Sequence, residues 1–182
     1  GVISLNGKLQ GLINPAGRGK AEFARFGQTF RVGDQVMQIR NDYNQPWTRD
    51  RGEELERGKG VFNGELGFIT SIHLEAEMFT VQFDDDRVSE YDFAQADEVT
   101  LSYAISIHKS QGSEFDAVVL ALSDGLPRKL LTRNILYTAI TRAKRLLVIV
   151  GSQDVVAYMV NNNQKGRRYS ALKARLRLAE TQ

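Results

Sequence analysis

A short polar stretch in the second half of the chain carries side chains that could do chemistry. It reads SIHKSQGSEFD, and its hydrogen-bonding members before Gly112 are Ser106, His108, Lys109, Ser110 and Gln111. Hydroxyls, an imidazole and backbone N–H groups can contact a phosphodiester chain. Gly112 permits a backbone conformation or a close approach that other residues forbid, and Glu114 could accept a hydrogen bond from a ribose hydroxyl. An ordinary polar loop is the alternative, which spacing alone does not exclude.

A second candidate cluster lies in TRNILYTAITRAKR, which we expect to be helical. With about 100° between residues, one arc of this helix is apolar and consists of Ile135, Leu136, Ala139, Ile140 and Ala143. The neighbouring arc carries hydroxyls and guanidinium groups and consists of Asn134, Thr138, Thr141, Arg142 and Arg145. Arginine suits planar, multi-donor recognition of phosphate. Because Arg142 falls at the edge of the apolar arc, we expect it to be half-buried beside an anionic partner; a solvated face is the alternative.

The elements around these clusters predict a sheet. Alternating apolar residues over 99–107 predict a half-buried strand, and the apolar runs at 117–122 and 146–152 predict strands covered on both faces. The order strand, loop, strand, helix, strand is typical of a parallel α/β sheet. The polar loop would then follow the carboxyl end of a strand, where ligands gather in open α/β sheets.

The first half of the chain has a different pattern. Apolar spacing predicts an amphipathic helix from Ile3 to Ile13, and residues 35–40 a strand. Residues 44–60 show no periodicity and predict an exposed, mobile loop. Three short strands follow and suggest a small barrel, at residues 68–73, 78–83 and 87–91. A hairpin turn explains Asp84, Asp85 and Asp86 better than a metal site does.

The bulk composition narrows the classes of protein. The length of 182 residues suits one domain, or one domain with a small insert, and a hydrophobic content of 42% is enough for a core. No apolar stretch approaches the length of a membrane span. There are no cysteines and only two histidines, which makes a zinc site improbable and agrees with a reducing interior. Net charge is +2, but residues 41–98 hold 15 acids against 5 bases, while residues 128–177 hold 12 bases against one acid. A polyanion partner for the basic half, or a solvated basic face, would explain this segregation.

Several stretches resemble one helicase family. SIHKSQGSEFD resembles motif V of superfamily 1 helicases, and LYTAITRAKRLLVIVG resembles their motif VI. LNGKLQGLINP, GDQVMQIRNDY and VFNGELG resemble the RecD-like branch, which comprises the exodeoxyribonuclease V alpha subunit and stand-alone RecD-like helicases. The resemblance runs from about Val2 to Gly151. It implies an α/β fold in which a RecA-like, parallel-sheet motor domain (2A, residues 1–44 and 98–182) is interrupted by an SH3-like β-barrel insert (2B, residues 45–97).

The resemblance also implies roles for individual residues. The loop would contact DNA through Ser106, His108, Lys109, Ser110 and Gln111. Ser106 stands where the family has threonine. Gly112 and Glu114 would meet the nucleotide, the glutamate at its ribose. Arg142 would reach the γ-phosphate in the manner of an arginine finger. The implied partners are single-stranded DNA, translocated 5′ to 3′, the N-terminal motor domain of the same polypeptide, and, in one branch, other subunits of a helicase–nuclease complex.

The chain departs from a complete motor in one respect. The stretch before Gly19-Lys20 fails the phosphate-loop pattern, because Asn14 replaces the first glycine and Ala21 the hydroxyl residue. The acidic motif that holds Mg²⁺ in the first motor domain is absent as well. We therefore expect ATP and Mg²⁺ to be used by a longer protein, of which a chain starting at Gly1 is the C-terminal piece. Alone, it should neither hydrolyse ATP nor unwind DNA.

A different class of function stays open. The chain could be a non-catalytic module that binds nucleic acid or protein through its barrel. The barrel sequence is acidic, which is unusual for gripping DNA, so DNA contact there would need a local patch near Lys59 and Asn63. The basic segment 165–177 could touch DNA or a partner, or be solvated. A nuclease is disfavoured, because the acids sit in a turn and a loop rather than in one converging site.

Overall fold

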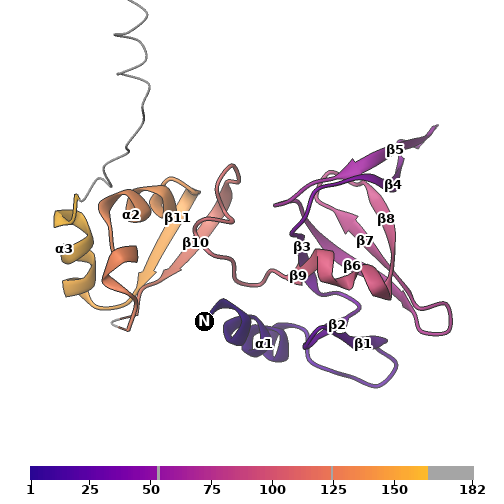
Figure 1. Cartoon of the computed structure of the whole chain (residues 1–182), viewed down its shortest axis with the longest axis horizontal. Coiled ribbons are helices and arrows are strands. Elements are labelled where there is room, and N and C mark those ends of the chain that lie inside the picture. Colours follow the sequence, from indigo (N-terminus) through magenta and orange to yellow (C-terminus); the bar gives the residue numbers. More distant parts are fainter. Residues whose placement is uncertain (53, 124, 164–182) are drawn as a thin grey trace, which may run out of the picture. The chain divides into compact units, whose positions relative to one another are not determined.

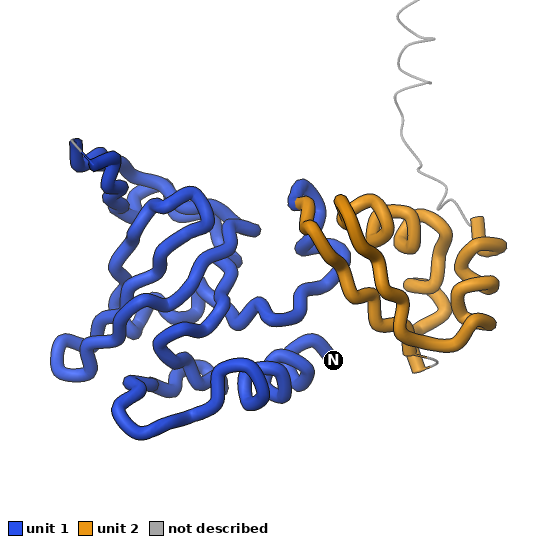
Figure 2. The backbone as a smooth tube through the Cα atoms, turned by 180° about the vertical axis from the view of Figure 1, so that it is seen from behind, with its two compact units in different colours: residues 1–113 blue, residues 114–182 orange. Residues whose placement is uncertain are grey.

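The computed structural model describes residues 1–52, 54–123 and 125–163. The chain divides into two compact units, residues 1–113 and residues 114–182, which are coloured separately in Figure 2. The basic segment 165–177 lies outside the described residues. In the part that the structure describes, no helix is both long and apolar enough to cross a membrane.

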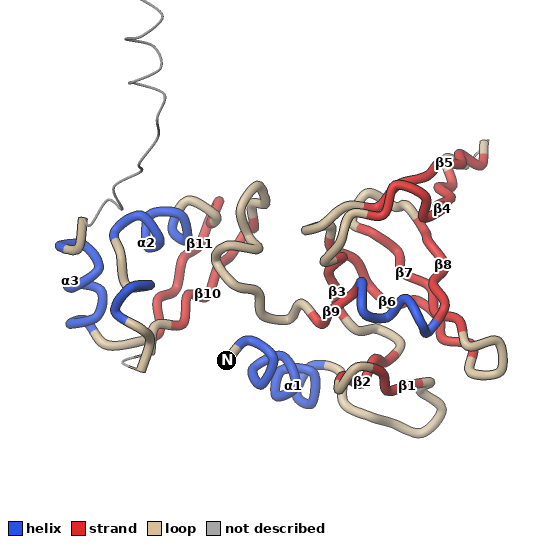
Figure 3. Tube along the Cα trace, viewed as in Figure 1, coloured by secondary structure: helices blue, strands red, loops and turns tan. Residues whose placement is uncertain are grey.

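The first unit is mainly antiparallel β-structure (Figure 1). Its elements are helix α1 (Val2–Ile13), strands β1 (Glu22–Arg25), β2 (Gln28–Arg31), β3 (Gln35–Gln38), β4 (Asp42–Asp50), β5 (Leu55–Val61), β6 (Leu66–His73), β7 (Met78–Phe83) and β8 (Val88–Asp92), the 3-10 helix η1 (Phe93–Glu98), and β9 (Val99–Leu101). Strands β1 and β2 form a hairpin, and the other seven form one sheet in the order β5-β4-β8-β7-β6-β3-β9. Figure 3 shows that this sheet is strongly curled.

Aromatic side chains fill the core of this unit. Phe23 and Phe93 stack with ring centroids 3.9 Å apart, and Phe79 lies 5.1 Å from Tyr91 and 5.2 Å from Phe23. Burial raises the pKa of Tyr91 strongly, and its hydroxyl donates to Gln38 Oε1 at 3.0 Å. The three strands predicted at residues 68–91 are confirmed as β6, β7 and β8, because their inward residues supply this core.

The prediction of a mobile loop at residues 44–60 is wrong. Most of this segment forms the β4–β5 hairpin, in which Thr48 pairs with Arg57 and Arg49 with Glu56. The usual apolar alternation is missing because ion pairs take its place: Arg49 Nη2 lies 2.7 Å from Glu56 Oε2. The aspartates at residues 84–86 form the turn between β7 and β8, as predicted, with Asp86 in the left-handed region (φ 66°).

The strand predicted at residues 99–107 is also largely wrong. Only Val99–Leu101 is a strand, and β9 pairs antiparallel with β3 in the sheet of the first unit. Beyond it, the backbone of Ala104 bonds to a side chain of α1 instead of to a strand. The polar loop therefore does not follow a strand of the parallel sheet; it precedes the amino end of β10.

Helix α1 matches its predicted span but buries the opposite face. Asn6, Gln10 and Asn14 are buried at intervals of four residues, whereas Ile3 and Leu12 are 77% and 79% exposed. The amides are buried because each finds partners in the first unit. Gln10 and Asn14 both donate to the Asp34 carboxylate at 2.6 Å, and Asp34 itself is completely buried.

The second unit contains one parallel pair of strands. Its elements are β10 (Phe115–Ala121), the 3-10 helix η2 (Arg128–Leu130), α2 (Arg133–Ile140), β11 (Ala143–Val150) and α3 (Gln153–Asn161). The crossover from β10 through α2 to a parallel β11 is the α/β connection that the sequence predicts. The predicted burial on both faces is wrong, since Val119 is 70% and Leu146 55% exposed. Within the described residues the pair has no further strand beside it, so much of its apolar surface is uncovered.

Candidate functional site

The polar loop at residues 106–112 is a compact series of turns. The backbone N–H of Ser110 donates to the carbonyl of Ser106 at 3.1 Å, and that of Gln111 to the carbonyl of His108 at 3.4 Å. The Ser106 hydroxyl accepts from the N–H of Lys109 at 3.4 Å. These bonds fold the loop back on itself.

The residues of the loop differ in solvent exposure. His108, Lys109 and Gln111 are exposed, and Ser106 is half-buried. Ser110 is only 6% exposed, and its hydroxyl donates to the carbonyl of Ile107 at 2.8 Å. Ser110 thus serves the turn itself, and the side chains offered to a ligand are those of its neighbours.

Gly112 ends the loop in a conformation that favours glycine. Its φ is +89°, in the left-handed region, and a Cβ placed on it would meet nothing within 4 Å. The glycine is therefore needed for its backbone angle and not for lack of space.

The sequence did not reveal what holds this loop in place. The Asn6 side chain donates to the carbonyl of Ala104 and accepts from its N–H, both at 2.8 Å. One residue earlier, the Tyr103 hydroxyl donates to Asp34 Oδ1 at 2.8 Å. Burial, and the hydrogen bond to Asp34, raise the pKa of Tyr103 to about 12. The segment entering the loop is thus tied to α1 and to the turn before β3; the spacing of Asn6, Gln10 and Asn14 was the signal available in the sequence.

Glu114 and Arg142 belong to the second unit and lie at the same end of its strands. Phe115 at the start of β10 pairs with Ala143 at the start of β11. Glu114, directly before β10, therefore lies next to Arg142, directly before β11. The N–H of Phe115 donates to the carbonyl of Arg142 at 2.8 Å. The Glu114 carboxylate is exposed and has Lys144 Nζ at 3.6 Å. Residues 28 positions apart in the sequence are therefore neighbours.

Arg142 itself is half-buried, as predicted, but not on a helix. Helix α2 ends at Ile140, so Ala143 and Arg145 lie on strand β11. They therefore do not belong to the helical arcs predicted from the sequence. The Arg142 guanidinium turns back onto the last turn of α2, where its Nε donates to the Thr138 carbonyl at 3.2 Å. A cation in this position complements the negative end of the helix dipole. The hydroxyls of Thr138 and Thr141 likewise donate to helix carbonyls, at 2.9 and 3.0 Å.

The predicted site residues therefore fall into two groups. Ser106 to Gly112 form a loop in the first unit, and Glu114 and Arg142 form a pair in the second. Each group offers chemistry for a nucleotide chain: hydroxyl, imidazole and ammonium groups in the first, a guanidinium and an exposed carboxylate in the second. Among the described residues, no group of three or more histidines, aspartates and glutamates could hold a metal ion.

Comparison with known proteins matches two segments of the chain to helicase families. Residues 5–83 match the family described as ATP-dependent RecD-like DNA helicase SH3 domain, and residues 101–150 match the UvrD-like helicase C-terminal domain. The chain thus joins a helicase C-terminal segment to an SH3 domain of RecD-like type. It belongs to the RecD-like helicases.

Individual relatives agree with this assignment. The chain is 35% identical to the ATP-dependent RecD2 DNA helicase of Deinococcus radiodurans over 97% of its own length and 22% of that protein. It is 40% identical to the RecBCD enzyme subunit RecD of Mycolicibacterium smegmatis over 81% of the chain and 23% of the subunit. An uncharacterized protein of Methanocaldococcus jannaschii, MJ1519, is 32% identical over 72% of the chain and 12% of its own length. The chain therefore spans less than a quarter of the length of each of these three relatives.

Proposed function

We propose that this chain is the C-terminal part of an ATP-dependent DNA helicase, in which it binds single-stranded DNA and completes the ATP site. The single observation that carries the proposal is the placing of Glu114 beside Arg142 by the register of β10 and β11. A carboxylate that can accept from a ribose and a guanidinium that can reach a phosphate are two of the groups that such a site needs.

The loop is the proposed DNA contact. His108, Lys109 and Gln111 project from it, and the Ser106 hydroxyl lies at its start. Lys109 supplies charge for a phosphate, while His108 and Gln111 can donate to phosphate or sugar oxygens. Translocation 5′ to 3′, as the family resemblance implies, is part of the proposal.

The two motor-domain segments are proposed to flank the barrel, with residues 1–44 and 98–182 in domain 2A and residues 45–97 inserted as 2B. Strands β3 and β9 support this division, since Gln38 pairs with Val99 and brings the entry and exit of the insert together. The compact units break instead at residue 113, because α1 and the segment around Ala104 pack with the barrel.

ATP and Mg²⁺ would be held largely by another part of the protein. Glu114 and Arg142 would face the ribose and γ-phosphate, and the phosphate loop and the Mg²⁺ ligands would come from the N-terminal motor domain. A further partner, other subunits of a helicase–nuclease complex, fits the naming of the RecBCD subunit relatives. The isolated chain is proposed to have no ATPase activity, which a phosphate-release assay on the purified chain tests directly.

The decisive experiment compares Arg142→Ala with Arg145→Ala in the longer protein. Arg145 is exposed on β11, three residues further on, and so provides a matched loss of charge. We expect Arg142→Ala to lower DNA-stimulated ATP turnover by about 10³-fold or more, with the affinity for single-stranded DNA changed less than twofold. Arg145→Ala should retain turnover. Equal turnover in the two variants would refute the role of Arg142.

A further inference from the structure

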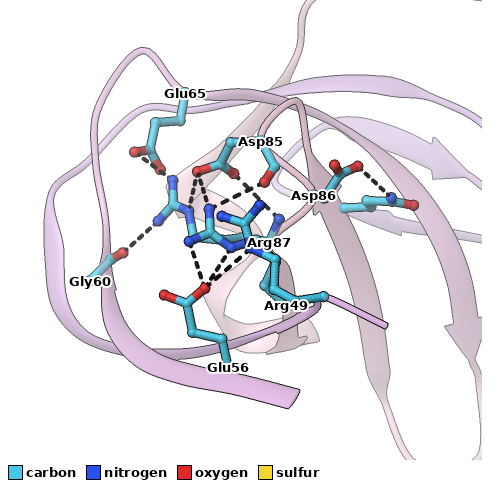
Figure 4. A network of polar contacts seen from close by, with 9 residues as sticks. Arg49, Glu56, Gly60, Glu65, Asp85, Asp86 and Arg87 are labelled. Carbon is cyan, nitrogen blue, oxygen red and sulfur yellow. Dashed lines mark hydrogen bonds and ion pairs between the residues drawn. The ribbon is translucent and has the colours of Figure 1, made fainter. Parts of the chain in front are cut away.

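The first unit satisfies its acidic side chains in two different ways. In the network of Figure 4, carboxylates near the surface meet guanidinium groups: Arg49 lies 2.7 Å from Glu56, and Arg87 lies 2.7 Å from Asp85. Asp34 is completely buried, and its partners are of another kind. Because a buried carboxylate is costly unless donors surround it, the identity of those donors indicates what the side chain holds in place.

The Asp34 carboxylate accepts four hydrogen bonds, two at each oxygen. Its Oδ1 accepts from Asn14 Nδ2 at 2.6 Å and from the Tyr103 hydroxyl at 2.8 Å. Its Oδ2 accepts from Gln10 Nε2 at 2.6 Å and from the backbone N–H of Arg31 at 2.7 Å. All four donors are uncharged groups. Hydrogen bonds to an ionised acceptor are stronger than bonds between neutral groups, so this carboxylate is a firm anchor for its partners.

The four donors come from separate stretches of the chain. Two lie on α1 or directly after it, one ends β2, and Tyr103 lies two residues after β9. Asp34 itself is fixed to the sheet, because its N–H donates to the Arg31 carbonyl at 3.0 Å and its carbonyl accepts from the N–H of Ile69 at 2.9 Å. One side chain thus connects the sheet to α1 and to the segment that leads into the loop at residues 106–112.

Tyr103 joins this carboxylate to the loop. Its ring packs against the aromatic core of the first unit while its hydroxyl donates to Asp34. The next residue, Ala104, is held by the Asn6 side chain through two hydrogen bonds of 2.8 Å. Two successive residues are therefore fixed, and the loop begins at Ser106, two positions further on.

We propose that Asp34 is a positioning residue for the loop at residues 106–112, which it holds through Tyr103 in the arrangement that contacts DNA. The inference rests on the DNA contact proposed for this loop. Asp34 is too deeply buried to meet DNA itself, so its effect passes through the short segment between Tyr103 and Ser106. Without the bond to Tyr103, the loop would sample other arrangements, and the fraction of molecules ready to bind DNA would fall.

A carboxylate suits this position better than an amide of the same shape. Each carboxylate oxygen accepts two hydrogen bonds, whereas the nitrogen of an amide only donates. In Asp34→Asn, the amide nitrogen would face two of the present donors whichever way the group turned, and at least one donor would lose its partner. This isosteric change should therefore loosen the same segment as removal of the Tyr103 hydroxyl does.

Hydrogen exchange in the full 182-residue chain measures how firmly the loop is held, without DNA. Tyr103→Phe removes only the hydroxyl, and we expect the hydrogen-bonded amides of Ala104 and Ser110 to exchange about 10-fold faster, with less than about a twofold change in β6 and β7. The matched control, Tyr91→Phe, removes a buried hydroxyl that donates to Gln38 Oε1 at 3.0 Å in the same unit. It should not act selectively on the loop. Wild-type exchange in Tyr103→Phe, or the same pattern of exchange in both variants, would overturn the proposal.

Asp34→Asn tests whether the effect passes through the carboxylate. In a chain that Trp47 fluorescence shows to be folded, Asp34→Asn should speed exchange at the same amides. Adding Tyr103→Phe to it should then change the rates by less than about twofold, because the two groups act as one unit. Additive effects would overturn the role of Asp34. Tyr103→Phe decides alone should Asp34→Asn fail to fold, since its hydroxyl donates to that carboxylate.

The consequence for DNA is measured in the longer protein, as the concentration of oligothymidylate that half-saturates ATP turnover. Tyr103→Phe should raise this concentration about 10-fold and leave turnover at saturating DNA within about twofold, because only the competent fraction of loops changes. Lys109→Ala tests the proposed DNA contact separately. If Lys109→Ala raises the concentration and Tyr103→Phe does not, the positioning role is overturned. If Lys109→Ala leaves it unchanged, the DNA contact proposed for the loop fails, and hydrogen exchange decides whether Asp34 holds the loop.

Discussion

The side-chain amide of Asn6 and the backbone of Ala104 exchange two hydrogen bonds of 2.8 Å across 98 positions of sequence. The amide oxygen accepts from the Ala104 N–H while the amide nitrogen donates to its carbonyl, so Asn6 replaces the neighbouring strand that this backbone lacks. Asn6 is 4% exposed, which makes the pair of bonds largely inaccessible to water. Helix α1 therefore fixes the approach to the loop at residues 106–112.

Replacing Asn6 by alanine should destabilise the first unit. The change leaves the N–H and carbonyl of Ala104 without their partners, and we expect a loss of about 1–3 kcal/mol in the free energy of unfolding. Urea denaturation followed by Trp47 fluorescence measures this loss. Lys8→Ala, on the exposed side of the same helix, should change the free energy by less than about 0.5 kcal/mol. Equal effects of the two substitutions would show that the Asn6 bonds contribute little.

Gly112 should tolerate only residues that accept a left-handed conformation. At φ +89° with open space around the Cα, asparagine is expected to be nearly neutral. Valine should cost about 1–2 kcal/mol or more, because its branched Cβ crowds the backbone. In the longer protein, Gly112→Val should weaken single-stranded DNA binding while Gly112→Asn preserves it. Equal DNA affinities for the two variants would separate the loop conformation from DNA binding.

The aspartates of the β7–β8 turn should respond to pH in opposite directions. Burial and the nearby Asp85 charge raise the pKa of Asp84. Burial alone would raise the pKa of Asp85 as well, but hydrogen bonds and charge from Arg87 lower it overall. A raised pKa means that ionisation of Asp84 costs stability as pH rises through it. A lowered pKa means that ionised Asp85 adds stability, which is lost as pH falls through it.

Asp84→Asn should therefore raise the free energy of unfolding at pH 7, and Asp85→Asn should lower it. Both differences from wild type should shrink in acid, where the wild-type carboxyls become protonated. Urea unfolding at pH 7 and near pH 3 checks the two signs, and each variant serves as the control for the other. A rise in stability on Asp85→Asn at pH 7 would contradict Asp85 as the ionised partner of Arg87, and a fall on Asp84→Asn would contradict the cost of ionising Asp84.

The sequence predicts local elements well where apolar periodicity and turn chemistry agree. Strands β6, β7 and β8 and the aspartate turn follow from that agreement. Strands β4 and β5 escaped prediction because Arg49 and Glu56 satisfy each other on the face where apolar residues are normally expected. A pattern of charges that pair only after folding looks like a loop in the sequence.

Tertiary partners explain the remaining differences. The side-chain amides of Asn6 and Gln10 on α1, and of Asn14 directly after it, are buried because they hydrogen-bond to Ala104 or Asp34, and neither partner is visible from the helix sequence. The positions of Glu114 and Arg142 at the same end of two strands depend on the register that pairs Phe115 with Ala143, which periodicity does not define. The motifs indicated candidate residues, and the structure supplies the neighbours of those residues and the role of Ser110 within its turn.

Gly58 is expected to be the least replaceable glycine of the β4–β5 hairpin. A Cβ on Gly58 would lie 2.3 Å from Cζ2 of Trp47, a contact that cannot be accommodated without moving the ring. The ring cannot move freely, because the guanidinium groups of Arg49 and Arg87 lie over it. We therefore expect Gly58→Ala to cost about 1–3 kcal/mol, as overpacking typically does.

The measurement uses the only tryptophan of the chain as its reporter. Gly58→Ala should lower the urea midpoint and shift Trp47 emission to longer wavelength, because a displaced ring becomes more exposed to water. Gly17→Ala is the matched control, since a Cβ there meets nothing within 4 Å. It should leave the emission unchanged and the stability within about 1 kcal/mol of wild type. Unchanged emission and midpoint in Gly58→Ala would mean that Trp47 is not held by the two arginines, and the rigidity of the hairpin would then need another source.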